Sequence, residues 1–264
     1  MANCKYPQPL SLVYRRGGLG DTLLTFPILE ALTNLGQNPI AVGNTDYFII
    51  AKEIGWAIDV YSEIPKLNFT NQIKISLDGN VPPFPKGREW IVSHYFRALG
   101  LSPKFSKTLP LKPFEKSPLS GKAVLHPSSG SRKKNLPPEL FLRIEHHLKA
   151  LGYETIYLIG EADLWLTEIV KNYWQSSSPL EIARALKTSA IFIGADSGIS
   201  HLASYCGVKT YILYGPTDPI IWKPIGQNTY QISLNLPCSP CFPNTCDAQP
   251  CLSPNLAELF FSLI

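Results

Sequence analysis

The sequence lacks the features that mark membrane-embedded and secreted proteins. No apolar run approaches the roughly 18 residues that a membrane-spanning helix needs. The opening segment MANCKYPQPLSLVYRRGG contains no long apolar core followed by a small-residue cleavage site. Both absences predict a cytoplasmic protein.

Strong net charge is lacking as well. Charged side chains make up 17% of the 264 residues, with 24 basic and 20 acidic groups and a net charge of +4. The whole excess lies in residues 1–118, which hold 13 basic and 9 acidic side chains. This bias fits an anionic ligand or a membrane surface and is too weak for DNA binding, so we expect no nucleic-acid partner. The apolar share of 45% excludes wholesale disorder.

Two familiar nucleotide fingerprints are missing from the glycine turn at residues 15–21, RRGGLGD. The third glycine of GxGxxG is absent, and no Gly-Lys-Ser/Thr follows as in a P-loop. The turn comes after a predicted strand and places Asp21 where α/β sheets bind ligands. Asp21 is therefore either a site residue or the cap of the helix that follows.

What is present is an alternation of strand and helix patterns, which is typical of parallel sheets built from βαβ units. Pro27 must kink the first helix or restart it. A proline-rich stretch at 102–121 is the predicted linker between domains 1–118 and 119–264. We thus expect two Rossmann-like α/β domains facing a cleft. Strands are expected at 10–14, 39–43, 57–61, 72–77, 122–126, 154–159, 190–193 and 209–214, and helices at 28–35, 89–99, 138–151, 162–173, 179–187, 198–206 and 253–261.

Two turns in the second half carry polar groups suited to an anion. HPSSGSRKK at 126–134 offers Ser128, Ser129 and Lys134 to a diphosphate, with a solvated basic turn as the alternative. The second turn, ADSGISH, ends in His201, which is either a site residue or structural. Amides at Ser197 and Gly198 would face an anion at a helix N-terminus, and Asp196 could hold sugar hydroxyls.

Four of the six cysteines fall within residues 238–251. Cys238, Cys241, Cys246 and Cys251 are separated by two, four and four residues. A cytoplasmic location argues against disulfides. The cluster is either a structural zinc or iron site or a set of free thiols.

Taken in order, several stretches resemble glycosyltransferase family 9, the heptosyltransferases, which have the GT-B fold. The stretches are GLGDTLLTFP (18–27), HPSSGS with KNLP (126–137), LIGEAD (158–163) and DSGISHLA (196–203), with YGPTDP at 214 and the cysteine segment in support. The match covers nearly all of the second half and the start of the first.

The resemblance implies an inverting, metal-independent transfer of heptose from a nucleotide diphosphate donor, with ADP-heptose expected. Asp21 would be the general base, and the first domain would bind the acceptor. In the second domain, Asp163 would contact the nucleotide ribose and Asp196 the transferred sugar. The diphosphate would be held by Ser128, Ser129, Lys134, Ser197 and Gly198, with His201 nearby.

The acceptor implied by the resemblance is a glycan such as lipopolysaccharide core, which would allow peripheral contact with the inner membrane surface. A protein acceptor and a non-catalytic nucleotide-sugar-binding relative are the alternatives. The sequence departs from the family pattern at Ser128, often glycine, at Leu136, usually tryptophan, and at Asp163, where glutamate is usual. The first domain is also shorter than is typical.

Overall fold

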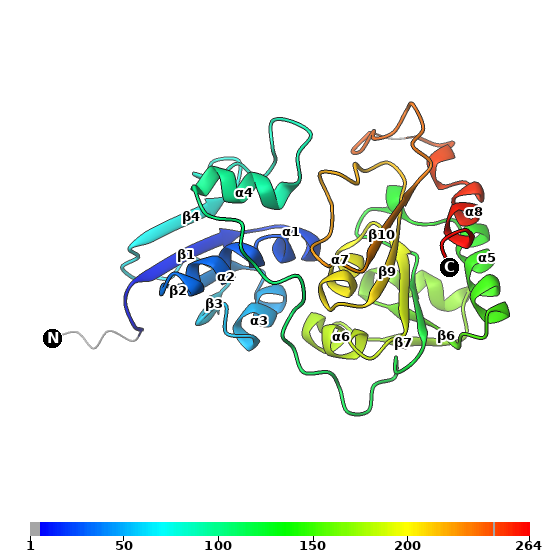
Figure 1. The fold of residues 1–264 in the computed structure, drawn as a ribbon, viewed down its shortest axis with the longest axis horizontal. Helices are drawn as coiled ribbons and strands as arrows, with labels where there is room; N and C mark the ends of the chain where they lie inside the picture. Colours follow the sequence, from blue (N-terminus) through cyan, green and yellow to red (C-terminus); the bar gives the residue numbers. More distant parts are fainter. Residues whose placement is uncertain (1–5, 245) are drawn as a thin grey trace. The chain divides into compact units, whose positions relative to one another are not determined.

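A computed structural model describes residues 6–244 and 246–264, with the side chains of 161 and 162 left aside. The chain forms two compact units, which divide between Pro110 and Leu111. This division lies inside the stretch 102–121 that the sequence marks as a linker. Each unit is built on its own parallel sheet (Figure 1), so the predicted class of two α/β domains is confirmed.

The first unit has a four-stranded sheet in the order β3-β2-β1-β4. Its strands, all parallel to their neighbours, are β1 (Leu10–Arg15), β2 (Asn38–Gly43), β3 (Asp59–Tyr61) and β4 (Asn71–Ile75). The carboxyl ends of β1 and β4 meet at one edge, where Arg15 pairs with Ile75. That edge carries the glycine turn and Asp21.

Within the described residues, this unit has four helices, namely α1 (Leu19–Leu23), α2 (Phe26–Asn34), α3 (Thr45–Glu53) and α4 (Ile91–Leu99). Pro27 lies in the first turn of α2 and so restarts the helix, one of the two predicted outcomes. The sequence analysis missed α3, although its N-cap Asn44 accepts a hydrogen bond from the Asp46 amide. Phe26 at the start of α2 and Phe48 of α3 stack with ring centroids 6.1 Å apart, so the two helices meet at this point.

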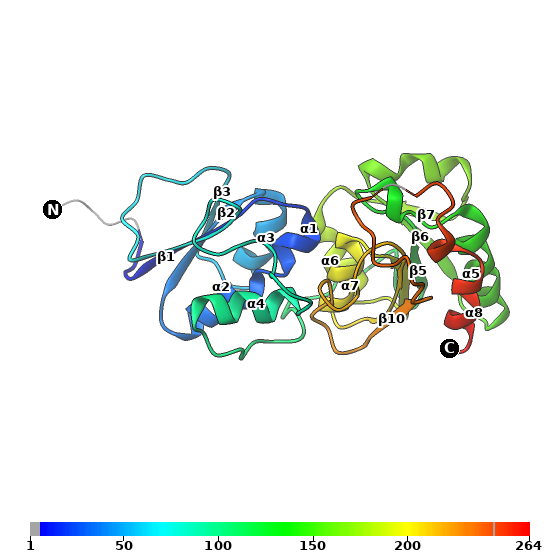
Figure 2. The same cartoon turned by 90° about the horizontal axis from the view of Figure 1, so that it is seen from above.

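The two faces of the first sheet are covered differently. The helices pack on the face that carries Val13 and Ala41, both fully buried. On the other face, Leu10, Leu12, Ile40 and Val42 form a small core. Among the described residues, its partly buried cover comes only from non-helical segments, namely from Tyr6, Tyr14, Ile58, Tyr61, Leu67 and Phe69. The connection from β3 to β4 runs over residues 62–70 without regular structure (Figure 2).

The second unit has a six-stranded parallel sheet in the order β10-β9-β8-β5-β6-β7. Its strands are β5 (Ala123–His126), β6 (Thr155–Ile159), β7 (Tyr173–Gln175), β8 (Ile191–Ala195), β9 (Lys209–Tyr214) and β10 (Thr229–Ser233). The sequence analysis missed the two edge strands, β7 and β10. Strands β9, β8 and β5 are neighbours, so the turns that follow them lie side by side.

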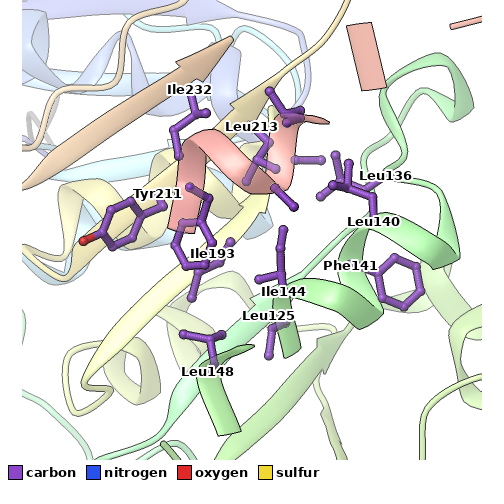
Figure 3. Packing of buried hydrophobic residues seen from close by; sticks show 14 of the residues in the cluster. Leu125, Leu136, Leu140, Phe141, Ile144, Leu148, Ile193, Tyr211, Leu213 and Ile232 are labelled. Carbon is purple, nitrogen blue, oxygen red and sulfur yellow. The ribbon is translucent and has the colours of Figure 1, made fainter. Parts of the chain in front are cut away.

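Helices cover both faces of this sheet. Helices α5 (Pro138–Ala150) and α8 (Asn255–Phe261) lie together on one face, and α6 (Pro179–Leu186) and α7 (Gly198–Tyr205) lie on the other (Figure 1). Figure 3 shows Leu140, Ile144 and Leu148 of α5 packed beside strand residues such as Leu125 and Ile193. This cluster is the main core of the unit.

The prediction of a helix at 162–173 is wrong in both type and extent. A 3₁₀ segment, η2 (Glu161–Glu168), occupies its first half, and the chain then enters β7. Leu166 and Val170 are both buried, so the apolar spacing that suggested a longer helix does reflect a core-facing side. Short 3₁₀ turns also form at η1 (Arg132–Lys134) and η3 (Pro250–Leu252).

The proline-rich linker is held at both ends. The buried carboxylate of Glu30 on α2 accepts bonds from the Ser106 amide at 2.7 Å and the Ser106 hydroxyl at 2.5 Å. In the second unit, the Phe114 amide donates to the Arg184 carbonyl at 3.3 Å. In the part of the chain that the structure describes, no helix is long and apolar enough to cross a membrane.

Candidate functional site

The carboxyl edge of the second sheet gathers three turns from neighbouring strands. β5 leads into the 127–131 turn and η1, β8 leads into Asp196, and β9 leads into Thr217. Ligands of parallel α/β sheets bind at this edge because the loops that follow the strands project there. The sequence prediction named residues on the first two turns and missed the third, although 214–224 was part of the family-like pattern.

Asp196 is the centre of this edge. Its Oδ2 accepts from Thr217 Oγ1 at 2.7 Å and lies 3.3 Å from Lys134 Nζ, and its Oδ1 lies 3.8 Å from His201 Nε2. Burial alone would raise the pKa of this carboxyl. The interactions with His201, Lys134 and Thr217 outweigh burial and lower the pKa of Asp196 to about 2. The structure thus brings together Lys134, Asp196 and His201, as the sequence analysis expected, and adds Thr217.

The N-terminus of α7 points to the same edge because α7 begins directly after Asp196 and Ser197. Ser197 is the N-cap, and its hydroxyl accepts from the Ser200 amide at 3.3 Å. Gly198 and Ile199 are the first helical residues, whose amides have no carbonyl partner within the helix. The helix dipole adds partial positive charge at this point. The turn is therefore suited to an anion.

Ser128 and Ser129 have different roles in the neighbouring turn. Among the described residues, the fully buried Ser128 Oγ has no hydrogen-bond partner. Ser129 is engaged in its own turn, since its amide donates to Asn135 Oδ1 at 2.9 Å and its hydroxyl accepts from the Ser131 amide at 3.4 Å. An unpartnered buried hydroxyl is costly, so Ser128 is the better candidate to contact a ligand.

The contacts of Asp163 are with residues outside the network around Asp196. Its Oδ2 accepts from the Gly160 amide at 3.1 Å at the start of η2 and lies 3.9 Å from His126 Nδ1. His126 Nδ1 is itself 2.9 Å from the Leu158 carbonyl, an acceptor that requires the proton on this nitrogen. Asp163 is buried. A role toward a ribose remains a prediction for this residue.

The cysteine segment folds over the same edge. The amides of Cys241 and Phe242 both donate to the Pro216 carbonyl, at 2.8 and 2.9 Å. Lys133 Nζ donates to the Pro243 carbonyl at 2.5 Å, and Lys134 Nζ lies 5.8 Å from the Phe242 ring centroid. The segment therefore packs against the turn after β9 and against η1. Phe242 is a further candidate for the site that the sequence analysis did not name.

The four thiols of this segment are close enough to influence one another. Burial and the neighbouring Cys241, Cys238 and Cys246 raise the pKa of Cys251. Cys238 and Cys246 are exposed. Within residues 6–244 and 246–264, however, no group of three or more His, Cys, Asp or Glu side chains is arranged to hold a metal ion. A metal bound by these four thiols therefore stays a prediction.

In the first unit, Asp21 is fixed at both carboxylate oxygens. Arg15 Nη2 donates to Oδ1 at 2.6 Å, and the Gly18 amide donates to Oδ2 at 3.0 Å. Gly17 makes this geometry possible, because a Cβ there would lie 2.8 Å from Asp21 Cβ. Asp21 does cap α1, as one of the two interpretations held. Its side chain is still 26% exposed, against 6% for Arg15, so it remains open to a ligand.

Tyr95 of α4 lies near this ion pair. Burial raises the pKa of Tyr95 well above its ordinary value, Arg15 opposes the shift and Asp21 adds to it. The Tyr95 hydroxyl donates to the Pro83 carbonyl at 3.1 Å. The pair of Arg15 and Asp21 is therefore set against a neutral phenol on the helix-covered face.

Comparison with known proteins agrees with this architecture. The family model of glycosyltransferase family 9 (heptosyltransferase) matches residues 100–252, which is more than half of the chain. Lipopolysaccharide heptosyltransferase 1 of Pseudomonas aeruginosa is 33% identical over 69 residues, 26% of this chain and 19% of that protein. The alignment thus spans about a fifth of the length of that relative.

Two solved structures share the fold. Heptosyltransferase TibC, an iron-containing dodecamer from Escherichia coli, was solved with ADP-D-β-D-heptose; it has a TM-score of 0.75 at 16% identity, covering 97% of this chain and 76% of that one. Escherichia coli ADP-heptose lipopolysaccharide heptosyltransferase II has a TM-score of 0.74 at 11% identity, covering 97% and 98%. Together with the matched family model, the ordered motifs and the paired parallel sheets lead to one conclusion: this chain belongs to glycosyltransferase family 9, the heptosyltransferase family.

Proposed function

We propose that this chain is a glycosyltransferase that moves a heptose from a nucleotide diphosphate donor to a hydroxyl of a glycan acceptor. The observation that carries the proposal is the polar network of Lys134, Asp196, His201 and Thr217 at the N-terminus of α7. A lysine, free helix amides and a buried carboxylate at one sheet edge suit a ligand that is both phosphorylated and hydroxylated.

In this proposal the diphosphate binds to the second unit. Lys134 Nζ, the first amides of α7 and the unpartnered Ser128 hydroxyl supply hydrogen bonds and positive charge. When the bond between the anomeric carbon and the diphosphate oxygen breaks, negative charge develops on that oxygen. Lysine and helix dipole stabilise this charge, so the proposed step uses no metal ion.

Asp196 would orient the transferred sugar. Its carboxylate stays ionised throughout the physiological range, since its pKa is about 2. Thr217, Lys134 and His201 hold it in one position, and a carboxylate has lone pairs left for a sugar hydroxyl. A fixed acceptor of this kind can align the anomeric carbon for attack.

Asp21 would act as the general base. The acceptor hydroxyl attacks the anomeric carbon, its proton passes to the Asp21 carboxylate, and the nucleoside diphosphate departs from the opposite face of the sugar. Attack opposite the leaving group inverts the anomeric configuration. Arg15 and the Gly18 amide each occupy one lone pair of the carboxylate, which leaves others for the proton.

The similar proteins narrow the choice of donor and acceptor. TibC was solved with ADP-D-β-D-heptose, and the matching Pseudomonas aeruginosa protein is a lipopolysaccharide heptosyltransferase. We therefore infer ADP-heptose as the donor and a lipopolysaccharide-type glycan as the acceptor for this chain.

A second candidate is a nucleotide-sugar-binding protein without transferase activity. One observation favours it: Asp21 already has two structural duties, the ion pair with Arg15 and the cap of α1. If these are its only duties, a donor would bind to the second unit without being transferred.

A thermal-shift panel of ADP, UDP, GDP and ADP-heptose tests the donor site. A ligand at one hundred times its dissociation constant stabilises the fold by about 2.7 kcal/mol, which raises the melting temperature visibly. We expect a shift with the ADP compounds that Lys134→Ala removes and Lys133→Ala keeps, because Lys133 contacts only the Pro243 carbonyl among the described contacts of its ammonium group. If no nucleotide raises the melting temperature, the proposal is contradicted. If ADP compounds raise it but no ADP is released from ADP-heptose in the presence of an acceptor, the second candidate is favoured.

A further inference from the structure

Residues 239–243 form a strap at the carboxyl edge of the second sheet. The Pro216 carbonyl accepts hydrogen bonds from the amides of Cys241 and Phe242, at 2.8 and 2.9 Å. The Ser239 hydroxyl donates to the carbonyl of the glycine that precedes Pro216, at 2.6 Å. Three hydrogen bonds within five residues fix the backbone of the strap against the turn that follows β9.

The strap also contacts the turn that follows β5. Lys133 of η1 donates from Nζ to the Pro243 carbonyl at 2.5 Å. In the sheet, β8 lies between β9 and β5. The strap is therefore held on both sides of the strand end that carries Asp196. Because three bonds hold it at the β9 turn, the strap keeps its place when Lys133 is replaced.

Phe242 is the aromatic residue of the strap, and its ring faces the lysine of the donor edge. Lys134 Nζ lies 5.8 Å from the ring centroid. An ammonium group within about 6 Å of an aromatic face is attracted to the negative charge density of that face. Phe242 is 42% exposed, so core burial does not explain its position. The ring serves the lysine more than it serves the core.

Lys134 thus has two partners of different kinds, the Asp196 carboxylate at 3.3 Å and the Phe242 ring. An ammonium group has three donors, and the carboxylate takes one of them. The ring has no net charge, so it holds the cation without repelling an anionic ligand. A second carboxylate in its place would hold the cation as well and would oppose a diphosphate. The two contacts fix the ammonium group and leave it available to an anion.

This arrangement affects affinity through conformational entropy. A lysine side chain has many rotamers, and ordering it at the moment of binding lowers affinity by roughly three- to tenfold. Lys134 is held on two sides in the chain without a ligand, and 18% of its side chain is exposed. An ordered lysine binds a diphosphate without this loss.

We propose that Phe242 is a positioning residue for donor binding, whose ring orders the Lys134 ammonium group before the diphosphate arrives. The inference rests on the proposed function for the diphosphate as the ligand of Lys134. Phe242 acts through Lys134 and does not touch the reacting atoms.

The contact between ring and lysine is measured first, by NMR on the full chain without nucleotide. Lysine side chains receive ¹³C-methyl groups by reductive methylation, and the Lys134 signal is the one absent from Lys134→Ala. Phe242→Leu removes the ring current and should move this signal. The matched control is Tyr230→Leu. Tyr230 is 43% exposed, and its ring centroid lies 5.8 Å from Lys209 Nζ, so its loss should move the Lys209 signal and leave that of Lys134 in place.

Calorimetric titration with ADP measures the consequence for binding. Phe242→Leu should weaken ADP binding by roughly three- to tenfold, without a change in melting temperature because the side chain is partly exposed. Phe242→Tyr keeps the ring face and should restore the affinity of the unaltered chain. In the Lys134→Ala background, Phe242→Leu should cause no further loss, because the ring then has no ammonium group to order. Tyr230→Leu should bind ADP as the unaltered chain does.

The outcomes separate this inference from the proposed function. The inference is overturned if Phe242→Leu leaves the Lys134 signal or the ADP affinity unchanged, or if it weakens ADP binding equally with and without Lys134. The proposed function still stands in these cases when Lys134→Ala weakens ADP binding. If the unaltered chain binds no ADP, the proposed function fails, and the inference fails with it because Lys134 then meets no diphosphate.

Discussion

Each of the two units contains a parallel sheet whose faces must be covered, and the two units cover their sheets with different amounts of chain. The second unit covers both faces of six strands with helices. Among the described residues, the first covers one face of four strands with helices and leaves the other to side chains from loops and strands, most of them aromatic. Parallel sheets normally have both faces covered because their strands are buried on both sides. The less complete cover therefore lies on the first unit, over the face of Leu12 and Ile40.

The polar groups at the two sheet edges are also held to different degrees. In the second unit, Lys134, His201 and Thr217 converge on Asp196 from separate elements. In the first, Asp21 is held by Arg15 and one backbone amide from its own turn. Asp196 is thus held by a network from separate elements, whereas Asp21 is held within and beside its own turn. Mutations at the two edges should therefore have separable effects.

The largest expected effect is on turnover. Asp21→Asn removes the proton acceptor but keeps an oxygen that the Gly18 amide can reach, so turnover should fall by roughly 10²–10⁴-fold while ADP affinity stays the same. The measurement is steady-state transfer together with calorimetric ADP titration. If ADP affinity falls in parallel with turnover, the proposed division of labour between the units is wrong. The melting temperature serves as the control for the lost pair with Arg15.

The next effect is on donor affinity. Lys134→Ala removes a charge-assisted contact to the diphosphate and should weaken ADP binding by about 1.5–3 kcal/mol, which corresponds to roughly 10- to 150-fold. Lys133→Ala is the matched control, since it removes an adjacent cation. Equal affinities in the two variants would contradict the assignment of Lys134.

A smaller effect concerns stability. Asp196→Asn leaves the buried His201 and the half-buried Lys134 without a carboxylate and should lower the free energy of unfolding by about 1–3 kcal/mol at neutral pH. The pKa of Asp196 is about 2 in the folded chain, below the ordinary value of about 3.9. Its contribution is therefore full above about pH 4 and is lost as the pH falls toward 2.

Denaturation measured between pH 5 and pH 2 tests whether the stabilising contribution of Asp196 decreases as the pH falls. The stability difference between the unaltered chain and Asp196→Asn should shrink as the pH falls. A difference that is constant with pH would show that the effect of the substitution is on packing and not on charge.

The smallest expected effect is at the cysteine segment. If a metal is bound there, purified protein should contain about one equivalent of zinc or iron by elemental analysis, and Cys241→Ser should lose it. Metal-free, folded protein with an unchanged melting temperature would identify the thiols as free.

Much of the fold could be predicted because the buried strands and amphipathic helices leave strong periodic patterns. The elements that the sequence analysis missed leave only weak or local signals in the sequence. Strand β7 has three residues, all at an edge, so little burial shapes its sequence. The 3₁₀ segment η2 has an apolar spacing close to that of an α-helix. Helix α3 could have been found from its N-cap Asn44.

The candidate site was predictable in part for a related reason. Lys134, Asp196 and His201 follow strands at glycine- and serine-rich turns, which sequence reveals. Thr217 and Phe242 reach the same edge only because β9 pairs with β8 and the cysteine segment folds back, and pairing of distant segments leaves no local pattern. The unpartnered Ser128 hydroxyl likewise depends on its packing and not on its neighbours in the chain.

The bond between Glu30 and Ser106 has a consequence for the connection between the units. Ser106 is anchored to the first unit and Phe114 to the second, so the connection between the units is at most the residues between them, of which Leu109 and Leu111 are themselves buried. Eight residue steps span at most about 28 Å. A tether this short gives each unit a millimolar local concentration of the other, however dilute the protein. The rate per molecule should therefore be insensitive to dilution, and the same two units cut apart would depend on diffusion to meet.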